Sequence, residues 1–308
     1  IEAPPLHAGA SPWRYRHRLS LALRRRADGS WFAGMHAWDD PSRLFDLRDC
    51  CITDDRVLAL WREVLAASNG LPDGLPDVAA LRGTVRLVGE RGAFILEGAT
   101  AWPGADPFVA RLASFDHAWW IPEGGRRKRI GVARGTAGPH ASFSQVNPAV
   151  AAQMAAFVEA RVAALAPTHV VDAYAGAGDL AAALHARGIR TSAVELDDEA
   201  GAHSATRLQR PSRAVTARVE DVIAGLLPAD VVVLNPPRSG VDERVTATIE
   251  AADRALKAVI YVSCDPATLA RDLARMPSWT IREVTAFDMF PQTAHVETVV
   301  ELGRGATP

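Results

Sequence analysis

The chain has 308 residues, a net charge of −2, 48% hydrophobic residues and 23% charged residues. This composition is typical of a globular protein with room for two domains. A slightly negative net charge excludes a protein that binds nucleic acid through its overall charge. No apolar run is long enough to cross a membrane, and Ile1–Pro5 lacks the basic start and apolar core of a signal peptide. The three cysteines, Cys50, Cys51 and Cys264, make no disulfide framework, so we expect a cytoplasmic protein.

Residues 1–140 are expected to form a smaller, β-leaning α+β domain. Alternating apolar residues predict strands over residues 15–23, 31–35, 81–87 and 93–97, the last two joined as a hairpin by the turn at Gly89–Gly92. Apolar residues at helical spacing predict a helix over residues 54–67.

Two basic clusters lie in this region. They are Arg14, Arg16, Arg18, Arg24, Arg25 and Arg26 in the first, and Arg126, Arg127, Lys128 and Arg129 in the second. Together with Trp119 and Trp120 they suit a surface that binds a polynucleotide, because arginine makes bidentate contacts to phosphate and aromatic rings stack on bases. The same residues also fit an ordinary β-domain with core tryptophans and solvated arginines.

Residues 141–308 alternate between strand and helix patterns. A helix is expected over residues 149–164, followed by strands over residues 170–172, 191–195, 214–218, 231–234, 259–263, 281–287 and 296–302. Helical stretches separate the first five strands, and a short loop over residues 288–293 joins the last two. This order predicts an α/β fold, a doubly wound Rossmann-like sheet with an antiparallel terminal hairpin.

Cys264 follows a buried strand in the run Ser263-Cys-Asp-Pro266. Pro266 suits the first position of a helix and Asp265 suits its cap, so Cys264 lies at the carboxyl end of a strand, just before a helix N-terminus. Ligands bind at that edge of an open α/β sheet, and a helix N-terminus favours a thiolate. Cys264 is therefore a candidate nucleophile, although a lone cysteine is often only a small buried hydrophobic residue.

The run Asp172-Ala-Tyr-Ala-Gly176-Ala-Gly178 follows the first strand of this domain and opens a helix. The glycines allow a tight turn and close approach to a ligand, but Asp172 would repel a pyrophosphate. An acid here suits S-adenosylmethionine, and Glu195, at the end of the next strand, can accept both ribose hydroxyls. The alternative is a glycine turn with a capping acid. Asp221, after the third strand, is placed to reach the adenine.

Polar residues also mark the ends of the later strands. Asn235 begins Asn-Pro-Pro-Arg238, where paired prolines stiffen a turn and the amide offers a donor and an acceptor to a planar heterocycle. Glu297, at the start of the last strand, is either a surface charge or a base at the same sheet edge.

These residues resemble a known family. The motifs are Phe143-Ser-Gln145-Val-Asn147, Asp172-x-x-x-Gly-x-Gly178, Asn235-Pro-Pro-Arg-Ser-Gly240, Ser263-Cys-Asp-Pro-Ala-Thr-Leu-Ala-Arg-Asp272 and Asp288-Met-Phe-Pro-Gln-Thr-Ala-His-Val-Glu297. The set is similar to the S-adenosylmethionine-dependent RNA uracil-5-methyltransferases, which act on tRNA and rRNA, and the match is dense from Gln145 onward.

The resemblance implies a mechanism. Cys264 would attack ring carbon 6 of uracil, carbon 5 would take the methyl group, and Glu297 would remove the proton from carbon 5. The cofactor would be bound by Gln145, Asp172, Tyr174, Gly176, Gly178, Glu195, Asp221 and Asn235. The RNA substrate would be bound by Asn235, Arg238, Arg126 and Arg127, with the target base splayed out of the folded RNA. A monomer with no metal site is expected.

The chain also departs from the family pattern. The family usually has Asp where Asn235 stands, which motivates the alternative of a catalytically weakened module that binds S-adenosylmethionine and RNA. Many members carry an upstream β-barrel and an iron–sulfur site with four cysteine ligands. In this sequence only Cys50 is in register with one of those ligands, the last, so no iron–sulfur cluster is expected. Asn-Pro-Pro also resembles the motif of amino-group N-methyltransferases, although Arg238 stands where those have an aromatic residue.

Overall fold

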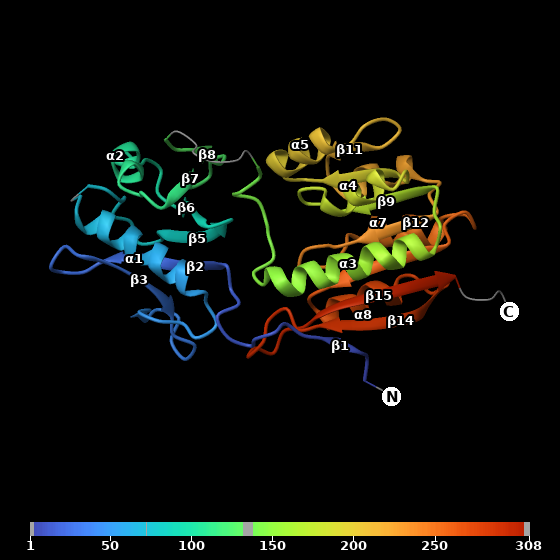
Figure 1. The fold of residues 1–308 in the computed structure, drawn as a ribbon, viewed down its shortest axis with the longest axis horizontal. Coiled ribbons are helices and arrows are strands. Elements are labelled where there is room, and N and C mark those ends of the chain that lie inside the picture. The colour runs from blue at the N-terminus through green and yellow to red at the C-terminus, as the bar shows by residue number, and fades with distance from the viewer. Residues whose placement is uncertain (1–2, 72, 132–137, 305–308) are drawn as a thin grey trace. The chain divides into compact units, whose positions relative to one another are not determined.

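The computed structural model describes residues 3–71, 73–131 and 138–304, and the chain forms two compact units. Residues 11–141 make the N-terminal unit, and residues 1–10 with 142–308 make the C-terminal unit, as the colours of Figure 1 allow the reader to follow. Among the described residues, no helix has both the length and the apolar character needed to cross a membrane.

The first ten residues lie in the C-terminal unit, whereas the sequence placed all of residues 1–140 in one N-terminal domain. Strand β1 (Leu6–His7) pairs in parallel with β14 (Trp279–Phe287), and the N–H of Ala286 donates to the carbonyl oxygen of Pro5 at 2.8 Å. The His7 ring stacks on Phe287, with 4.9 Å between ring centroids. A strand of two residues has no periodicity, so its pairing could not be predicted.

The N-terminal unit contains a seven-stranded sheet in the order β4-β3-β2-β5-β6-β7-β8. Its strands are β2 (Arg18–Arg25), β3 (Trp31–His36), β4 (Leu44–Asp46), β5 (Arg82–Val88), β6 (Arg91–Glu97), β7 (Phe115–Ile121) and β8 (Lys128–Arg129), and its helices are α1 (Asp55–Asn69) and α2 (Ala105–Ala110). The predicted strands, the predicted helix and the β5–β6 hairpin are all confirmed within a few residues.

The core of this unit lies between the sheet and α1. Leu19, Leu21 and Leu23 alternate along β2 and pack with apolar residues of α1, which puts the even-numbered residues of β2 on the opposite face. Trp119 and Trp120 are 3% and 8% exposed, so they belong to the core and are not an open stacking surface. The interpretation of these two side chains as core tryptophans is therefore the correct one.

The C-terminal unit contains an eight-stranded sheet in the order β1-β14-β15-β13-β12-β9-β10-β11. Its further strands are β9 (His169–Ala173), β10 (Arg190–Glu195), β11 (Arg213–Thr216), β12 (Val231–Leu234), β13 (Ala258–Ser263) and β15 (Glu297–Arg304). The helices are α3 (Pro148–Ala164), α4 (Asp179–Ala186), α5 (Asp198–Arg207), α6 (Val219–Val222), α7 (Glu243–Ala251) and α8 (Pro266–Ala274), with a 3-10 turn at Ile223–Leu226.

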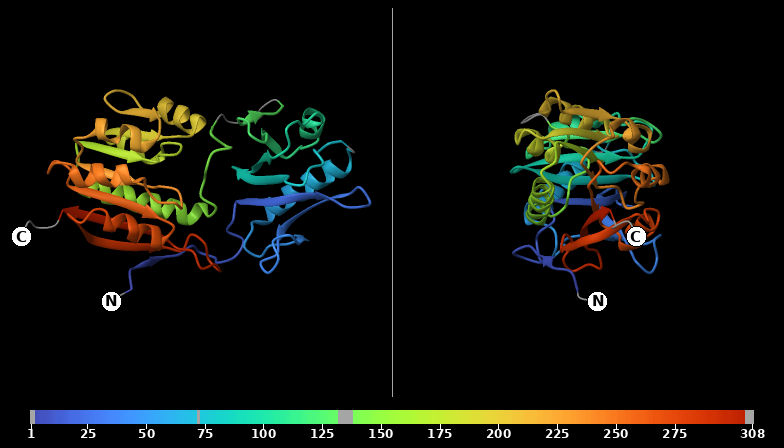
Figure 2. Two further views of the ribbon diagram at one scale, coloured as in Figure 1. Left: turned by 180° about the vertical axis from the view of Figure 1, so that it is seen from behind. Right: turned by 90° about the vertical axis from the view of Figure 1, so that its right-hand side faces the viewer.

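Helices cover both faces of this sheet, as Figures 1 and 2 show. Val231, Val233 and Ile260 face α3, while the intervening Val232 and Tyr261 face the side of α7 and α8. Strands buried on both faces read as continuous apolar runs, which is why these segments were predicted as buried strands.

The strand pairing confirms the doubly wound sheet. Strands β9 to β13 pair in parallel, and β14 and β15 pair with each other in antiparallel fashion. Strand β15 also pairs with β13, so it lies inside the sheet, and β1 occupies the outer edge beside β14. The parallel strands β9 to β13 therefore end at one edge, which is where most of the predicted site residues lie.

Candidate active site

The carboxyl ends of the parallel strands bring most of the predicted residues to one edge. Strand β9 lies between β10 and β12, so the strand order reverses there, and ligands of open α/β sheets bind beside such a reversal. Glu195 ends β10, Asn235 follows β12, and Cys264 follows β13. Glu297 opens β15, which runs the other way, so its first residue reaches the same edge.

The glycine turn after β9 is held by Glu195. The carboxylate of Glu195 accepts hydrogen bonds from the N–H of Gly176 and the N–H of Asp197, both at 2.8 Å. Gly178 has a φ of +75°, and a Cβ there would lie 2.2 Å from the Oγ of Ser204. Gly176 has a φ of +56°, and a Cβ there would meet nothing within 4 Å. The turn therefore needs glycine at both positions and leaves open space beside Gly176.

Asp172 is a buried acid with an unmatched oxygen. The side chain is 3% exposed, and its Oδ2 has no hydrogen-bond partner. Burial raises the pKa of this carboxyl to about 7, and the N–H of Ala181 opposes the shift by donating a hydrogen bond to it. A buried carboxyl with a free oxygen, next to an open glycine turn, fits a ligand that brings a cation or a donor.

Tyr174, Asp221 and Gln145 were also predicted to bind the cofactor, and they differ in exposure and in the partners of their side chains. The ring of Tyr174 packs against the apolar core on the α7 and α8 side, and its backbone has a φ of +62°. Asp221 is exposed and pairs with Arg244 at 3.0 Å. Gln145 is half-buried, and its side chain forms no hydrogen bond with the described residues. Gln145 is thus available to a ligand, whereas Tyr174 contributes mainly to the shape of the turn.

Cys264 is half-buried, and its surroundings disfavour the thiolate. Burial raises the pKa of the thiol, Glu297 raises it further, and Arg238 opposes both effects. This net direction is opposite to the lowering expected from a helix N-terminus, because burial and Glu297 outweigh it. Asp265 caps α8, and its carboxylate accepts the N–H groups of Ala267 at 2.8 Å and Thr268 at 3.0 Å, so the thiol does not receive those donors.

Glu297 is 4% exposed, and burial raises its pKa to about 7. Arg238 opposes this shift as well, so one guanidinium acts on both Cys264 and Glu297. Ser263, which precedes Cys264, and Thr298, which follows Glu297, are paired in register in the neighbouring strands β13 and β15. Thiol, carboxyl and guanidinium therefore form one group, in which the charge of Arg238 stabilises both ionised forms.

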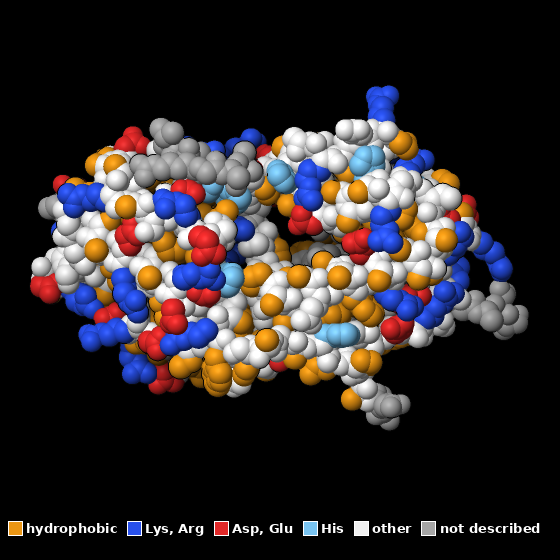
Figure 3. Space-filling model, in the orientation of Figure 1, with side chains coloured by type: hydrophobic (Ala, Val, Ile, Leu, Met, Phe, Trp, Pro, Cys, Tyr) orange, Lys and Arg blue, Asp and Glu red, His pale blue; other side chains and the backbone are white. Residues whose placement is uncertain are grey.

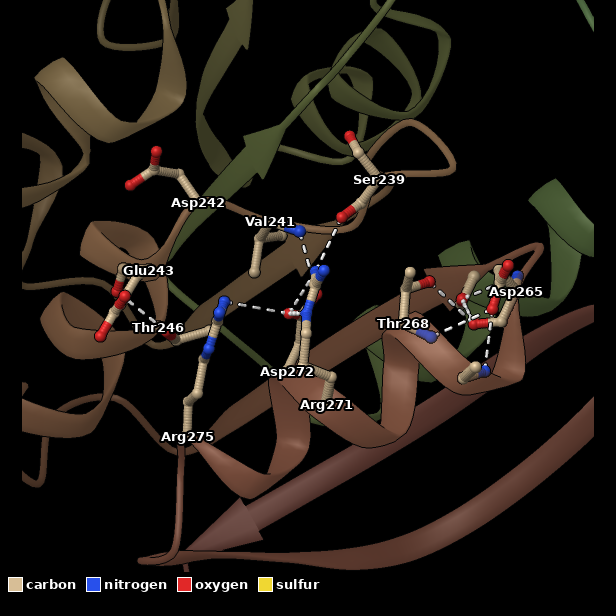
Figure 4. Close-up of polar contacts among 12 residues, drawn as sticks. Ser239, Val241, Asp242, Glu243, Thr246, Asp265, Thr268, Arg271, Asp272 and Arg275 are labelled. Atoms are coloured by element: carbon tan, nitrogen blue, oxygen red, sulfur yellow. Dashed lines mark hydrogen bonds and ion pairs between the residues drawn. The ribbon is translucent and has the colours of Figure 1, made fainter.

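The loop that carries Asn235 and Arg238 is held by a buried carboxylate that the sequence did not single out. Asp272 of α8 is 0% exposed, and its Oδ2 accepts the hydroxyl of Tyr261 at 2.7 Å and the N–H of Val241 at 2.9 Å. Its Oδ1 accepts the guanidinium of Arg271, which also donates to the carbonyl oxygen of Ser239 at 2.7 Å, as Figure 4 shows. The helix after the candidate nucleophile thus fixes the end of the loop.

The remaining predicted residues lie elsewhere. Arg126 is exposed and Arg127 is half-buried, and both belong to the N-terminal unit. Cys50 and Cys51 also lie there, and within the described parts of the chain no group of three or more His, Cys, Asp or Glu side chains is arranged to hold a metal ion.

Comparison with known proteins bears directly on this unit. A family model described as tRNA (Uracil-5-)-methyltransferase matches residues 203–305, which include Asn235, Cys264 and Glu297. The resemblance to the RNA uracil-5-methyltransferases is confirmed.

Curated relatives of the family show the same likeness. The 23S rRNA (uracil(747)-C(5))-methyltransferase RlmC of Vibrio cholerae is 33% identical over 168 residues, covering 53% of this chain and 44% of that protein. RlmC of Shewanella pealeana is 34% identical over 169 residues, covering 52% and 44%. The chain therefore matches less than half of the length of these relatives.

One solved structure supports the fold across both units. The crystal structure of Pyrococcus abyssi tRNA (uracil-54, C5)-methyltransferase in complex with S-adenosyl-L-homocysteine has a TM-score of 0.71 and 20% identity, and the match covers 97% of this chain and 78% of that one. The C-terminal unit accordingly has the Rossmann-like methyltransferase fold, and the N-terminal unit is an additional β-rich part.

Asp172→Asn is expected to stabilise the protein at high pH. Because the pKa of Asp172 is raised in the folded state, the contribution of this group to stability is greatest at low pH and is lost as the pH rises through about 7. The neutral amide removes this loss, so the variant should gain about 2–4 kcal/mol at about pH 8 and almost nothing near pH 4. Thermal unfolding at both pH values measures the effect, with Asp253→Asn as an exposed control. An equal gain at both pH values would contradict the burial of a charged Asp172.

Asp272→Ala is expected to lower the free energy of unfolding by about 3–5 kcal/mol, because Tyr261, Val241 and Arg271 lose a buried acceptor. Asp265 caps the N-terminus of the same helix and is also shown in Figure 4. Asp265→Ala removes only this cap and should lower the free energy of unfolding by about 1 kcal/mol. Urea denaturation of the two variants compares them directly. Similar losses would mean that Asp272 acts as an ordinary helix residue.

Proposed function

We propose that this protein methylates ring carbon 5 of a uridine in rRNA or tRNA, with S-adenosylmethionine as the methyl donor. The observation that carries the proposal is the group of Cys264, Glu297 and Arg238 at the ligand-binding edge of a methyltransferase sheet. A nucleophile next to a base is what uracil C5 methylation needs, because carbon 5 becomes reactive only after a nucleophile has added to carbon 6.

The residues that would hold S-adenosylmethionine fit it. Asp172 has a buried, unmatched carboxyl oxygen, Gly176 leaves open space, and Gln145 is available for hydrogen bonding. The side-chain charges that act on Asp172 are those of the acids Glu195 and Asp179, which suits a cationic ligand. Glu195 and Asp221 are the proposed contacts to the ribose and the adenine. When bound, S-adenosylmethionine supplies an electrophilic methyl group.

The protein groups act in a defined order in this mechanism. The thiolate of Cys264 forms a bond to carbon 6 of the uracil ring, and the electron pair of the C5–C6 double bond makes carbon 5 nucleophilic. After carbon 5 has been methylated, the carboxylate of Glu297 removes the proton from carbon 5. The C5–C6 double bond then re-forms as the thiolate leaves, and the enzyme regains its starting state when the carboxyl of Glu297 passes its proton to solvent.

Arg238 supports two of these steps. Its positive charge opposes the rise in the pKa of both Cys264 and Glu297, which favours the ionised forms that attack and deprotonate. Asn235 is exposed at the start of the same loop and offers both a donor and an acceptor to the uracil edge. We further propose a cytoplasmic monomer without an iron–sulfur cluster, in keeping with the expectation from the cysteines.

Cys264→Ala is expected to abolish methyl transfer, by at least about a thousandfold, because carbon 5 is then not activated. Tritium release from RNA labelled at uracil carbon 5 measures the reaction, with tRNA and rRNA lacking the modification tested separately. Cys51→Ala, an exposed cysteine of the N-terminal unit, is the control and should retain activity. Normal turnover by Cys264→Ala would refute the mechanism, and methyl groups found on an exocyclic nitrogen would favour the amino-group alternative.

Glu297→Gln is expected to separate attack from proton removal. The variant should lose turnover yet accumulate RNA bound covalently through Cys264, because the proton on carbon 5 cannot leave. In wild type, the rate should increase as the pH rises through about 7, since the carboxyl must be ionised to accept that proton. Denaturing gel electrophoresis detects the adduct. A variant that forms no adduct but binds RNA would assign Glu297 to an earlier step.

A further inference from the structure

Arg238 lies inside a β-turn whose own geometry is fixed. The N–H of Gly240 donates to the carbonyl oxygen of Pro237 at 2.9 Å, which places Arg238 and Ser239 at the centre of the turn. Pro237 adds a fixed φ, because its ring closes on the backbone nitrogen. The turn is thus held within itself, and its position depends on its contacts with the rest of the C-terminal unit.

The guanidinium of Arg271 reaches this turn from α8. Its Nη2 donates to the carbonyl oxygen of Ser239 at 2.7 Å, as Figure 4 shows. Gly240 has a φ of +77°, and a Cβ there would collide with the side chains of Arg271 and Asp272. The residue after Arg238 is therefore bonded to Arg271, and the following residue packs closely against it.

The ion pair between Arg271 and Asp272 does not by itself explain this position. Blue and red side chains lie next to one another over the surface seen in Figure 3, so an arginine beside an acid is common in this chain. Adjacent helix residues do not face each other, whereas residues three apart do, and Arg275 has that spacing from Asp272. Arg275 lies 3.4 Å from the Oδ1 of Asp272, so the buried carboxylate has a second cation. What Arg271 adds is the bond to the turn.

The position of the turn affects two groups of the proposed site. Burial, Glu297 and Asp265 raise the pKa of the Cys264 thiol. Arg238 lowers the pKa of this thiol, and it also opposes the rise that burial causes in the pKa of Glu297. The effect of a charge decreases with distance, so a displaced turn would weaken the influence of Arg238 on both groups.

We propose that Arg271 is a positioning residue. Its hydrogen bond to the carbonyl oxygen of Ser239 holds the guanidinium of Arg238 beside the thiol and the carboxyl of the site. The inference rests on the proposed uridine methylation, which uses the ionised forms of both groups. In this role Arg271 acts through Arg238, so its loss should move the pH dependence of the reaction and leave the chemical steps unchanged.

Arg271→Ala tests this role, with Arg275→Ala as the matched control. Both arginines are partly exposed in the same segment and pair with Asp272, but Arg271 is the one bonded to the turn. The measurement is single-turnover tritium release from RNA labelled at uracil carbon 5, between about pH 6 and about pH 9. Arg271→Ala should lower the rate about threefold to tenfold near pH ~7 and raise the midpoint of the profile by about 0.5–1 pH unit. Arg275→Ala should match wild type.

The shape of the profile separates positioning from a general loss of structure. A damaged fold lowers the rate by a similar factor at every pH, whereas a displaced Arg238 should matter little near pH ~9, where both groups ionise without it. Arg271→Lys keeps a donor for the Ser239 carbonyl and should restore the wild-type profile. The double variant Arg238→Gln, Arg271→Ala should shift the midpoint no further than Arg238→Gln alone. Additive shifts, an unchanged profile in Arg271→Ala, or an equal loss at every pH would overturn the proposal.

Alkylation of Cys264 distinguishes this proposal from the proposed function. The rate at which iodoacetamide labels this thiol, followed by mass spectrometry of its peptide, depends on the thiolate and needs no methyl transfer. If wild type releases tritium but Arg271→Ala has the wild-type profile in both assays, positioning is wrong and methylation stands. If Arg271→Ala raises the pH midpoint of alkylation but wild type methylates neither rRNA nor tRNA, methylation is wrong and the placement of Arg238 by Arg271 stands.

Discussion

The antiparallel pairing of β15 with β13 is the constraint on which the site depends. Cys264 follows the last residue of β13, whereas Glu297 is the first residue of β15. A parallel β15 would begin at the opposite edge of the sheet and place the carboxyl far from the thiol. Because the strand is antiparallel, with Ser263 opposite Thr298, the start of one strand meets the end of the other. Strand β15, inserted between β13 and β14, therefore does more than extend the sheet.

Helix α8 adds a second constraint on the same edge. Its first turn is capped by Asp265, next to Cys264, and its last turn carries Asp272, which holds the loop of Arg238. One short helix thus fixes both the candidate nucleophile and the loop whose cation acts on it. This explains why a buried carboxylate stands in a position that an apolar residue would otherwise occupy. A buried acid is acceptable here because all of its main acceptor positions are used by Tyr261, Val241 and Arg271.

The sequence predicted the sheet well because its central strands are buried on both faces. Val231–Leu234 and Val259–Ser263 were predicted within one residue, since uninterrupted apolar runs between turn residues are unambiguous. Strand β1 was missed, because two exposed residues carry no pattern and their pairing depends on chain segments far apart in sequence. The short strand β4 at the other sheet's edge escaped prediction for the same reason.

The sequence predicted which residues lie at the sheet edge, but it did not predict their electrostatics. Strand ends located Glu195, Asn235 and Cys264, because position along a parallel strand determines the sheet edge. The raised pKa of the Cys264 thiol was not anticipated, because sequence does not show that the thiol is half-buried, that Glu297 acts on it or that Asp265 occupies the helix donors. Asp272 is the last residue of the motif that begins at Ser263, but its position in that motif does not indicate that the side chain is buried.

Unfavourable electrostatics mark the sheet edge of the C-terminal unit. Asp172 and Glu297 are buried acids, and burial raises the pKa of each to about 7. Other charged groups of the described part of this unit have partners: Arg161 pairs with Glu301, and Lys257 with Asp230 at 2.8 Å. Folding alone would favour neutral residues in place of Asp172 and Glu297, since burying an unpaired charge costs stability. Their presence at this edge agrees with the proposed cationic ligand and pyrimidine ring.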